Sequence, residues 1–228
     1  MRTMVTTMLD GIRWVLFDAV GTLIYPDPPV ADVYRAAAQQ FGSRLSVNEI
    51  RQRFAAALTA NYSGGGPTSE TNERQRWRSI VSHVINDAPD VREVIFEHLW
   101  RHFSQPQHWR LYDVVAETLS ELRRRGFQLG IASNFDGRLT GIVDGHLALK
   151  LCEAVFVSSQ VGYTKPDARF FRVIEKWLGI DPAQIALVGD DEGSDVQGAT
   201  AAGWRAVRLD RDSKTRRSGT IHSLVELW

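Results

Sequence analysis

The chain has 228 residues, enough for one sizeable domain or a domain with a smaller insert, and its 27 basic residues balance its 27 acidic residues. The balance argues against a nucleic acid or an anionic membrane surface as partner, and the single cysteine, Cys152, excludes an intramolecular disulfide. Because no apolar run is long enough for a signal peptide or a membrane span, we expect a cytoplasmic protein whose residues 1–10 form a tail.

The first predicted strand is the apolar run from Trp14 to Phe17. It delivers Asp18 to a point where Gly21 and Thr22 open a turn. A carboxylate at the end of a buried strand either turns the chain or serves a site, and this stretch alone favours neither. Residues 24–29 contain three prolines and predict a linker without helix or strand.

The next eighty residues predict helices and show no strand signal. Apolar residues keep helical spacing in four segments, and Ser46 with Glu49 predicts a capping box at the start of the second. A loop is predicted at residues 63–67. The helical segments are 30–41, 47–58, 77–85 and 91–103. We interpret this region as a four-helix insert.

From about residue 112 short apolar strands alternate with helices. Such alternation implies right-handed crossovers and a doubly wound parallel α/β sheet, which the first strand joins most simply. The predicted strands are 127–132, 154–157, 185–188 and 205–209, and the predicted helices are 113–125, 138–145, 167–178 and 196–203.

Polar side chains follow these strands, and ligands of open parallel sheets bind beyond the carboxyl ends of the strands. The acids among them could hold a hard divalent cation, and the hydroxyl, amide and ammonium groups could hold phosphate oxygens. The set comprises Asp18, Thr22, Ser133, Asn134, Lys165, Asp190 and Asp195. Each has an ordinary structural explanation, but those explanations do not require all of them to meet at one sheet edge.

Together these residues resemble the four motifs of the haloacid dehalogenase-like (HAD) hydrolases, in order. The motifs are Asp18-Ala-Val-Gly-Thr22, Ser133-Asn134, Lys165-Pro166 and Gly189-Asp190 through Asp195. The resemblance implies a Rossmann-like core formed by residues 11–27 and 110–228, with residues 28–109 as the helical cap. It also implies a phosphatase-like hydrolase that acts on a small phosphorylated or other anionic substrate.

The resemblance assigns a role to each motif residue. Asp18 would be the nucleophile that forms an aspartyl-phosphate intermediate, with Lys165 neutralising charge in catalysis. Thr22, Ser133, Asn134 and Lys165 would form the substrate and phosphate site. Asp18, Asp190, the carbonyl of Val20 and, from the outer shell, Asp195 would hold Mg²⁺.

One position departs from the family pattern. Phosphatases of this family usually carry a second aspartate two residues after the nucleophile, where this chain has Val20. Valine cannot transfer a proton, so the resemblance implies weak or narrow activity, with the proton coming from the substrate, water, Asp191 or Glu192.

Three alternatives were compared with the phosphatase. A 2-haloacid dehalogenase also lacks this acid, but Asp190 argues against it because dehalogenases do not normally show the Gly-Asp pair. A binding or regulatory protein would keep the site without turnover. A phosphonoacetaldehyde hydrolase needs a cap lysine, and between Asp18 and Lys150 the chain has none.

The cap offers candidate substrate contacts, each with a competing structural explanation. Arginines on an exposed helix face are usually solvated, and Trp77 has the spacing of a core residue. The candidates are Arg51, Arg53, Arg74, Arg76 and Trp77.

Overall fold

The computed structural model describes residues 8–62, 64–213, 215 and 217–228, and within these residues six parallel strands form the central sheet. The strand order is β10-β9-β8-β1-β5-β6, so the first strand joins this sheet, as predicted, and lies in its middle. The strands are β1 (Trp14–Phe17), β5 (Gln128–Ser133), β6 (Ala154–Val157), β8 (Ile185–Gly189), β9 (Arg205–Leu209) and β10 (Thr220–Ile221). The two-residue strand β10 has no recognisable sequence pattern.

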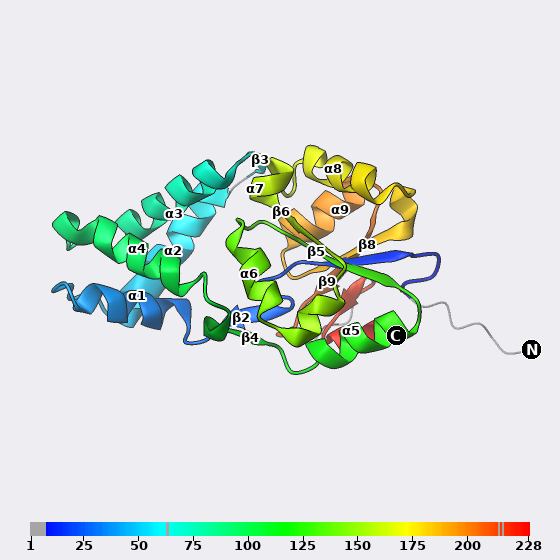
Figure 1. Cartoon of the computed structure of the whole chain (residues 1–228), viewed down its shortest axis with the longest axis horizontal. Coiled ribbons are helices and arrows are strands. Elements are labelled where there is room, and N and C mark those ends of the chain that lie inside the picture. The colour runs from blue at the N-terminus through cyan, green and yellow to red at the C-terminus, as the bar shows by residue number, and fades with distance from the viewer. Residues whose placement is uncertain (1–7, 63, 214, 216) are drawn as a thin grey trace, which may run out of the picture.

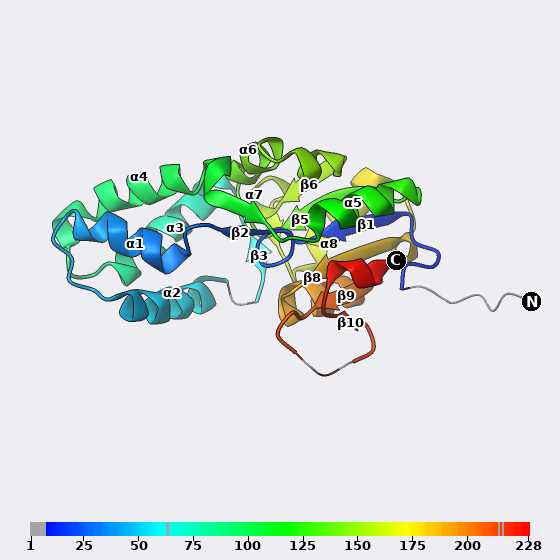
Figure 2. The same ribbon diagram turned by 90° about the horizontal axis from the view of Figure 1, so that it is seen from below.

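Helices cover both faces of the sheet (Figures 1 and 2). Alternate side chains of β1 face opposite sides: Val15 and Phe17 pack in the cluster that contains α5 and α6, whereas Trp14 and Leu16 pack in the cluster that contains α8 and α9. The helices are α5 (Val115–Arg124), α6 (Arg138–Asp144), α8 (Ala168–Leu178) and α9 (Gly198–Ala201). The predicted doubly wound α/β fold is therefore confirmed.

The inserted helices lie together on one side of the sheet in Figure 1 and pack around a hydrophobic cluster of their own. They are α1 (Val30–Gln39), α2 (Val47–Tyr62), α3 (Glu70–Val84) and α4 (Arg92–His102). We call them the cap helices. The predicted capping box is present, because the Ser46 amide donates to Glu49 and the Glu49 amide donates to the Ser46 hydroxyl. Because the cap helices have a hydrophobic core of their own, they can cover the edge of the sheet without contributing side chains to the core around the sheet.

Two short antiparallel ribbons correct the prediction that residues 24–109 contain no strand. Strand β2 (Ile24–Pro26) pairs with β4 (Trp109–Leu111), and β3 (Gly66–Pro67) pairs with β7 (Tyr163–Thr164). Proline is tolerated in both because each ribbon has only two strands and leaves an edge where the missing donor is not needed. The first ribbon joins the two ends of the cap insert, and the second joins a cap loop to the core.

Further short elements complete the chain. The helix predicted at residues 196–203 begins earlier, as a π-helical turn at Glu192–Gln197 that leads into α9, and α7 (Ser158–Val161) follows β6 directly. Single 3₁₀ turns occur at Pro89–Val91, Pro106–His108, Leu147–Leu151, Pro182–Gln184 and Leu224–Leu227. Residues 1–7 of the expected tail and residue 63 of the expected loop lie outside the described residues. None of the described helices combines the length and apolarity that a membrane span requires.

Candidate active site

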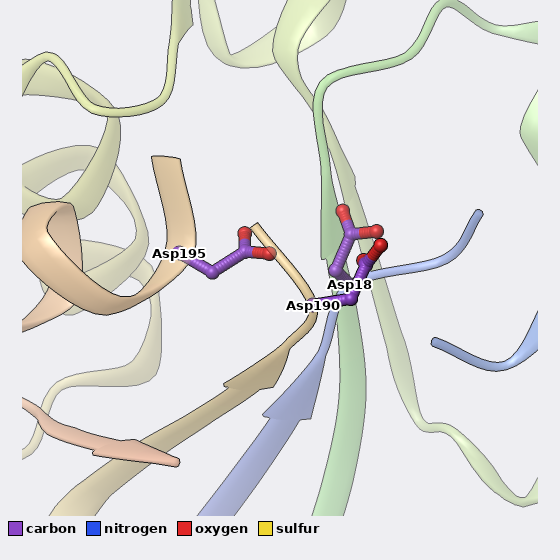
Figure 3. A group of neighbouring side chains, drawn as sticks. All are labelled: Asp18, Asp190 and Asp195. Carbon is purple, nitrogen blue, oxygen red and sulfur yellow. The ribbon is translucent and has the colours of Figure 1, made fainter. Parts of the chain in front are cut away.

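The sheet register brings the predicted residues to one edge. Phe17 pairs with Val188 on one side and with Ile131 on the other, so Asp18, Asp190 and Ser133 all follow or end neighbouring parallel strands. Figure 3 shows Asp18 and Asp190 side by side at the tips of β1 and β8, with Asp195 approaching them from the following helical turn. The Ser133 hydroxyl donates to Asp18 Oδ1 at 2.9 Å.

Lys165 is the central cation of this cluster. Its side chain is only 1% exposed, and Nζ donates to Asp18 Oδ1 at 2.8 Å, Asp195 Oδ1 at 2.5 Å and the Ala132 carbonyl at 2.8 Å. Burial opposes its charged form, but the charges of Asp18 and Asp195 outweigh this effect and raise the pKa of Lys165. The ammonium is therefore held charged inside the protein.

The chain reaches Lys165 by an indirect route. After β6 the backbone passes through α7 and turns at Gly162, whose φ of +92° is in the left-handed region that favours glycine. The Asn134 side chain then holds the backbone of Lys165: its Nδ2 donates to the Lys165 carbonyl at 3.0 Å, and its Oδ1 accepts from the Lys165 amide at 2.7 Å. Asn134 thereby positions the lysine.

The acids outnumber the cation that faces them. Oxygen atoms of Asp18, Asp190 and Asp195 lie within 4.8 Å of one another. Burial and the nearby charge of Asp18 raise the pKa of Asp190, and burial raises that of Asp195 although Lys165 opposes the shift. Converging carboxylate oxygens with excess negative charge are the donor set that a hard divalent cation prefers, so these residues fit Mg²⁺.

Two glycines permit this close approach of carboxylates and backbone. Gly21 has φ of +90°, and a Cβ there would collide with the Asp190 carboxylate. A Cβ on Gly189 would collide with the Asp195 carboxylate. Thr22 is fully buried, donates to Asp190 Oδ1 at 3.2 Å and is not among the cavity-lining residues that the structure describes. Its observed contact is with an acid of the site, and its contact with phosphate stays a prediction.

Sequence reasoning missed Arg211, which follows β9 and supports the first motif from the same edge of the sheet. Its guanidinium donates to the carbonyls of Gly21 and Thr22, the latter at 2.8 Å, and it stacks over Tyr112 with 3.6 Å between the guanidinium carbon and the ring centroid. Arg211 lies in a charged loop of the sequence, where nothing distinguishes it from its solvated neighbours.

A cavity of about 390 Å³ opens above the cluster, between the sheet edge and the cap helices. Asp18, Ser133, Asn134, Lys165, Asp190 and Asp195 line its base. Val20 also lines it and is 36% exposed, so the departure from the family motif faces the cavity. Asp191 reaches the cavity, whereas Glu192 pairs with Arg208 at 3.0 Å and does not line it.

The cap wall contains Trp77 but none of the four candidate arginines among the described lining residues. Arg74 pairs with Glu97 at 2.5 Å, and Arg76 pairs with the buried Glu73. Arg53 donates to Asn86, and Arg51 donates to Asn48 at 3.2 Å. The arginines therefore bind within the cap, and Trp77 is the candidate that faces the site.

Comparisons with known proteins agree with this geometry. A family model described as haloacid dehalogenase-like hydrolase matches residues 12–203. The haloacid dehalogenase-like hydrolase domain-containing protein 3 of Mus musculus is 32% identical over 86% of this chain and 80% of its own length. The phosphoserine phosphatase of Thermus thermophilus is 38% identical over 68% of this chain and 63% of its own. An HAD phosphatase structure from Thermococcus onnurineus superposes with a TM-score of 0.67, covering 95% of this chain and 96% of that one at 24% identity.

Proposed function

The chain belongs to the haloacid dehalogenase-like hydrolases, and from this premise we propose that it is a Mg²⁺-dependent phosphatase of small phosphorylated metabolites. The observation that carries the proposal is the meeting of three carboxylates, Lys165 and Ser133 at the base of one cavity. The likeness to the phosphoserine phosphatase supports phosphate as the group transferred. We further propose residues 11–27 and 110–228 as the core domain and residues 28–109 as the cap domain.

Asp18 is the proposed nucleophile. One of its carboxylate oxygens attacks phosphorus, the bond from phosphorus to the ester oxygen breaks, and the departing oxygen takes a proton from water or Asp191. A water oxygen then attacks phosphorus and returns one proton to the group that protonated the alcohol, the bond to the Asp18 oxygen breaks, and inorganic phosphate leaves with the carboxylate restored. The net reaction consumes one water and yields one alcohol and one phosphate.

The neighbours of Asp18 have distinct proposed roles. Lys165 Nζ, 2.8 Å from Asp18 Oδ1, balances charge on the nucleophile and on the phosphoryl group bonded to it. Ser133 already donates to Asp18, so its hydroxyl is placed to donate to a phosphoryl oxygen beside that carboxylate. Asn134 holds the Lys165 backbone, and Thr22 holds Asp190.

Asp18, Asp190, the Val20 carbonyl and Asp195 are the residues that we propose to hold Mg²⁺, Asp195 from the outer shell. When bound, the ion would offset the negative charge of the phosphoryl group and of these acids. Val20 cannot serve as the acid that protonates the leaving group. Because positioned acid–base catalysis contributes about 10²–10⁴-fold to a rate, we propose that turnover of unactivated esters is slow.

The test uses the purified chain with 4-nitrophenyl phosphate as an activated ester and ethyl phosphate as an unactivated one. We expect hydrolysis of the activated ester that EDTA abolishes and added Mg²⁺ restores, and a beryllofluoride adduct at Asp18. We expect Asp18→Asn to abolish both the hydrolysis and the adduct. Asp144→Asn, at an exposed position on α6, should abolish neither.

Three outcomes contradict the proposal in different ways. Adduct formation without hydrolysis of either ester would support the binding or regulatory alternative. Release of chloride from 2-chloropropionate in the absence of metal would support the dehalogenase. Neither hydrolysis nor an adduct would contradict both the phosphatase and the phosphate-binding role.

A further inference from the structure

The cavity is encircled by a closed ring of aromatic contacts. Successive ring centroids along the series Trp77, Phe54, Tyr34, Phe103, Trp109 and Phe135 lie 5.3–6.4 Å apart, and each of these residues lines the cavity. The Arg138 guanidinium closes the ring, with its carbon 5.6 Å from the Phe135 centroid and 5.9 Å from that of Trp77. We call these six aromatic residues the aromatic belt. The belt spans the cap helices and the core.

The upper wall of the cavity carries almost no charge. The described lining residues from the cap, residues 28–109, are all uncharged: Val30, Tyr34, Phe54, Leu58, Tyr62, Trp77, Phe103 and Trp109. Asp191 lines the cavity next to Asp190 and belongs with the acids of the base. Above these acids, the charged residue among the described lining residues is Arg138, and two of its nitrogens each donate to Asp136 at 2.7 Å. A fully buried carboxylate therefore already compensates this guanidinium.

A leaving group with a charge beside the upper wall would lose water there without gaining a partner. Phosphoserine, for example, carries an ammonium and a carboxylate besides its phosphate, and burying either without a partner is strongly unfavourable. An aromatic ring gains dispersion and quadrupole contacts with the belt, and its hydrophobic surface leaves water. A cavity of about 390 Å³ accommodates a ligand of one or two rings.

We propose that the aromatic belt selects phosphate monoesters whose alcohol part is an uncharged aromatic group. This inference rests on the proposed phosphatase function, because Asp18 at the base of the cavity sets where the phosphate lies. The belt then holds the alcohol part between cap and core.

The missing acid at Val20 agrees with this substrate class. A phenol has a pKa of about 10, whereas water, the reference for an unactivated hydroxyl, has a pKa of about 15.7. A phenolate can therefore leave with much less help from a proton donor than an alkoxide can. The side chain of Val20 also extends the apolar lining down to the acid cluster. Both features favour aryl esters.

The experiment compares esters that separate binding from leaving-group ability. Benzyl phosphate and O-phosphoserine both release primary alcohols, so their ratio of kcat/KM reports recognition of the ring against the charged group. Phenyl phosphate then reports the added effect of a phenolate leaving group. With Mg²⁺ present, we expect kcat/KM for benzyl phosphate to exceed that for O-phosphoserine at least about tenfold, and phenyl phosphate to be faster still.

Variants connect the preference to the belt. Trp77→Ala and Phe54→Leu should each lower the benzyl-to-phosphoserine ratio about tenfold. Trp177→Ala is the matched control, because Trp177 is 63% exposed and lies outside the cavity. A ratio measured within one variant is unaffected by partial loss of folded protein, so a destabilised variant remains informative.

A binding measurement distinguishes this inference from the phosphatase proposal. Calorimetry compares benzylphosphonate with the phosphonate analogue of phosphoserine, neither of which can be hydrolysed. Tighter binding of benzylphosphonate by about tenfold supports selection by the belt even if no ester turns over, an outcome that contradicts only the phosphatase. Equal or tighter binding of the serine analogue, or equal turnover of O-phosphoserine, overturns the inference and leaves the phosphatase standing.

Discussion

At the scale of single residues, Lys165 shows what sequence position alone cannot reveal. A lysine before a proline is by default a solvated side chain, and this one was assigned to a site because other polar residues follow the neighbouring predicted strands and because it matches a family motif. Its burial depends on oxygens supplied by Asp18, Asp195 and Ala132, which are distant in sequence. Such convergence follows from strand order, which residue spacing does not encode.

Replacing Lys165 by methionine should abolish turnover and destabilise the fold. The variant leaves Asp18 and Asp195 without their buried cation, and removing one partner of a buried ion pair costs about 3–5 kcal/mol. Added Mg²⁺ should recover part of the loss, because it supplies positive charge to the same acids. Thermal unfolding with and without Mg²⁺ measures both effects. Lys176→Met, on the exposed face of α8, is the control, and an unchanged Tm for Lys165→Met would contradict the role of this ion pair.

Replacing Val20 by aspartate should restore the missing proton donor. Val20 lines the cavity and is 36% exposed, so a carboxylate of similar size fits there and keeps its contact with water. We expect kcat for ethyl phosphate to rise about 10²-fold or more, with a smaller gain for 4-nitrophenyl phosphate because nitrophenolate needs no proton. Steady-state kinetics on both esters measures the difference. Val20→Asn, which has the same shape but transfers no proton, should show no gain; an equal gain would contradict acid–base catalysis at this position.

Other residues carried no signal in the sequence. Arg211 holds the carbonyls of the first motif, and Arg138 joins Asp136 to the cap by stacking 3.5 Å from the centroid of Trp100. Neither belongs to a motif or to a periodic apolar face. Apart from Asp136, which is two residues from Arg138, their partners lie far away in the chain, so their roles depend on the assembled fold.

At the scale of elements, periodic segments were predictable and two-residue strands were not. The amphipathic pattern of α8 and the continuous apolar run of β1 are long enough to identify, and the Asp167 side chain caps α8. Strand β3 consists of Gly66 and Pro67 and has no pattern of its own. Strand β3 is held in place by its pairing with β7, the strand that leads to Lys165. Next to this pairing, the Thr68 amide donates to the Gly162 carbonyl at 2.9 Å.

Gly65 forms a further close contact between this cap loop and the loop that carries Lys165. Its φ is +71°, and a Cβ there would lie 2.9 Å from the Asp167 amide nitrogen and 3.1 Å from Pro166 Cδ. Gly65→Ala should therefore push the cap loop away from the Pro166 backbone. We expect about 1–3 kcal/mol of lost stability and a fall in kcat/KM, because the loop that carries Lys165 shifts.

Gly64→Ala is the matched control for this contact. Gly64 has φ of +89° but open space around its missing Cβ, so the variant suffers the same kind of backbone strain without the collision. Thermal unfolding and kcat/KM are measured for both variants. If Gly64→Ala lowers kcat/KM as much as Gly65→Ala at equal loss of stability, strain and not the contact explains the effect.

At the scale of the whole molecule, the insertion of a helical unit into a parallel sheet was predictable, but its placement was not. The switch from helical to alternating periodicity near residue 112 marked the return to the sheet. The position of the cap over the strand ends depends on single contacts, such as Glu70, whose carboxylate accepts from the Gly137 amide at 2.9 Å and the Ser159 hydroxyl at 2.5 Å. A glutamate at the start of a helix gives no indication of such partners.

The segment that returns from cap to core contains a pair of stacked histidines. The rings of His102, at the end of α4, and His108 lie 3.6 Å apart, and His102 Nε2 is buried without a partner among the described residues. Burial, together with the nearby charges of His108 and His98, lowers the pKa of His102 from 6.5 to about 4. The folded protein therefore keeps this imidazole neutral at pH values where the unfolded chain protonates it.

This depressed pKa makes the cap-to-core connection sensitive to acid. Between pH 6.5 and about 4 the unfolded state binds more protons than the folded state at His102, so the free energy of unfolding falls as the pH falls through this window. We expect Tm to drop between pH 7.5 and 5, and His102→Phe, which keeps a ring against Phe103 and His108, to reduce that drop by on the order of 5 °C. His83→Phe, at an exposed position of α3, should leave the drop unchanged. If His102→Phe loses Tm on acidification as steeply as the parent, the acid sensitivity arises elsewhere, and the histidine stack does not couple the cap to the core.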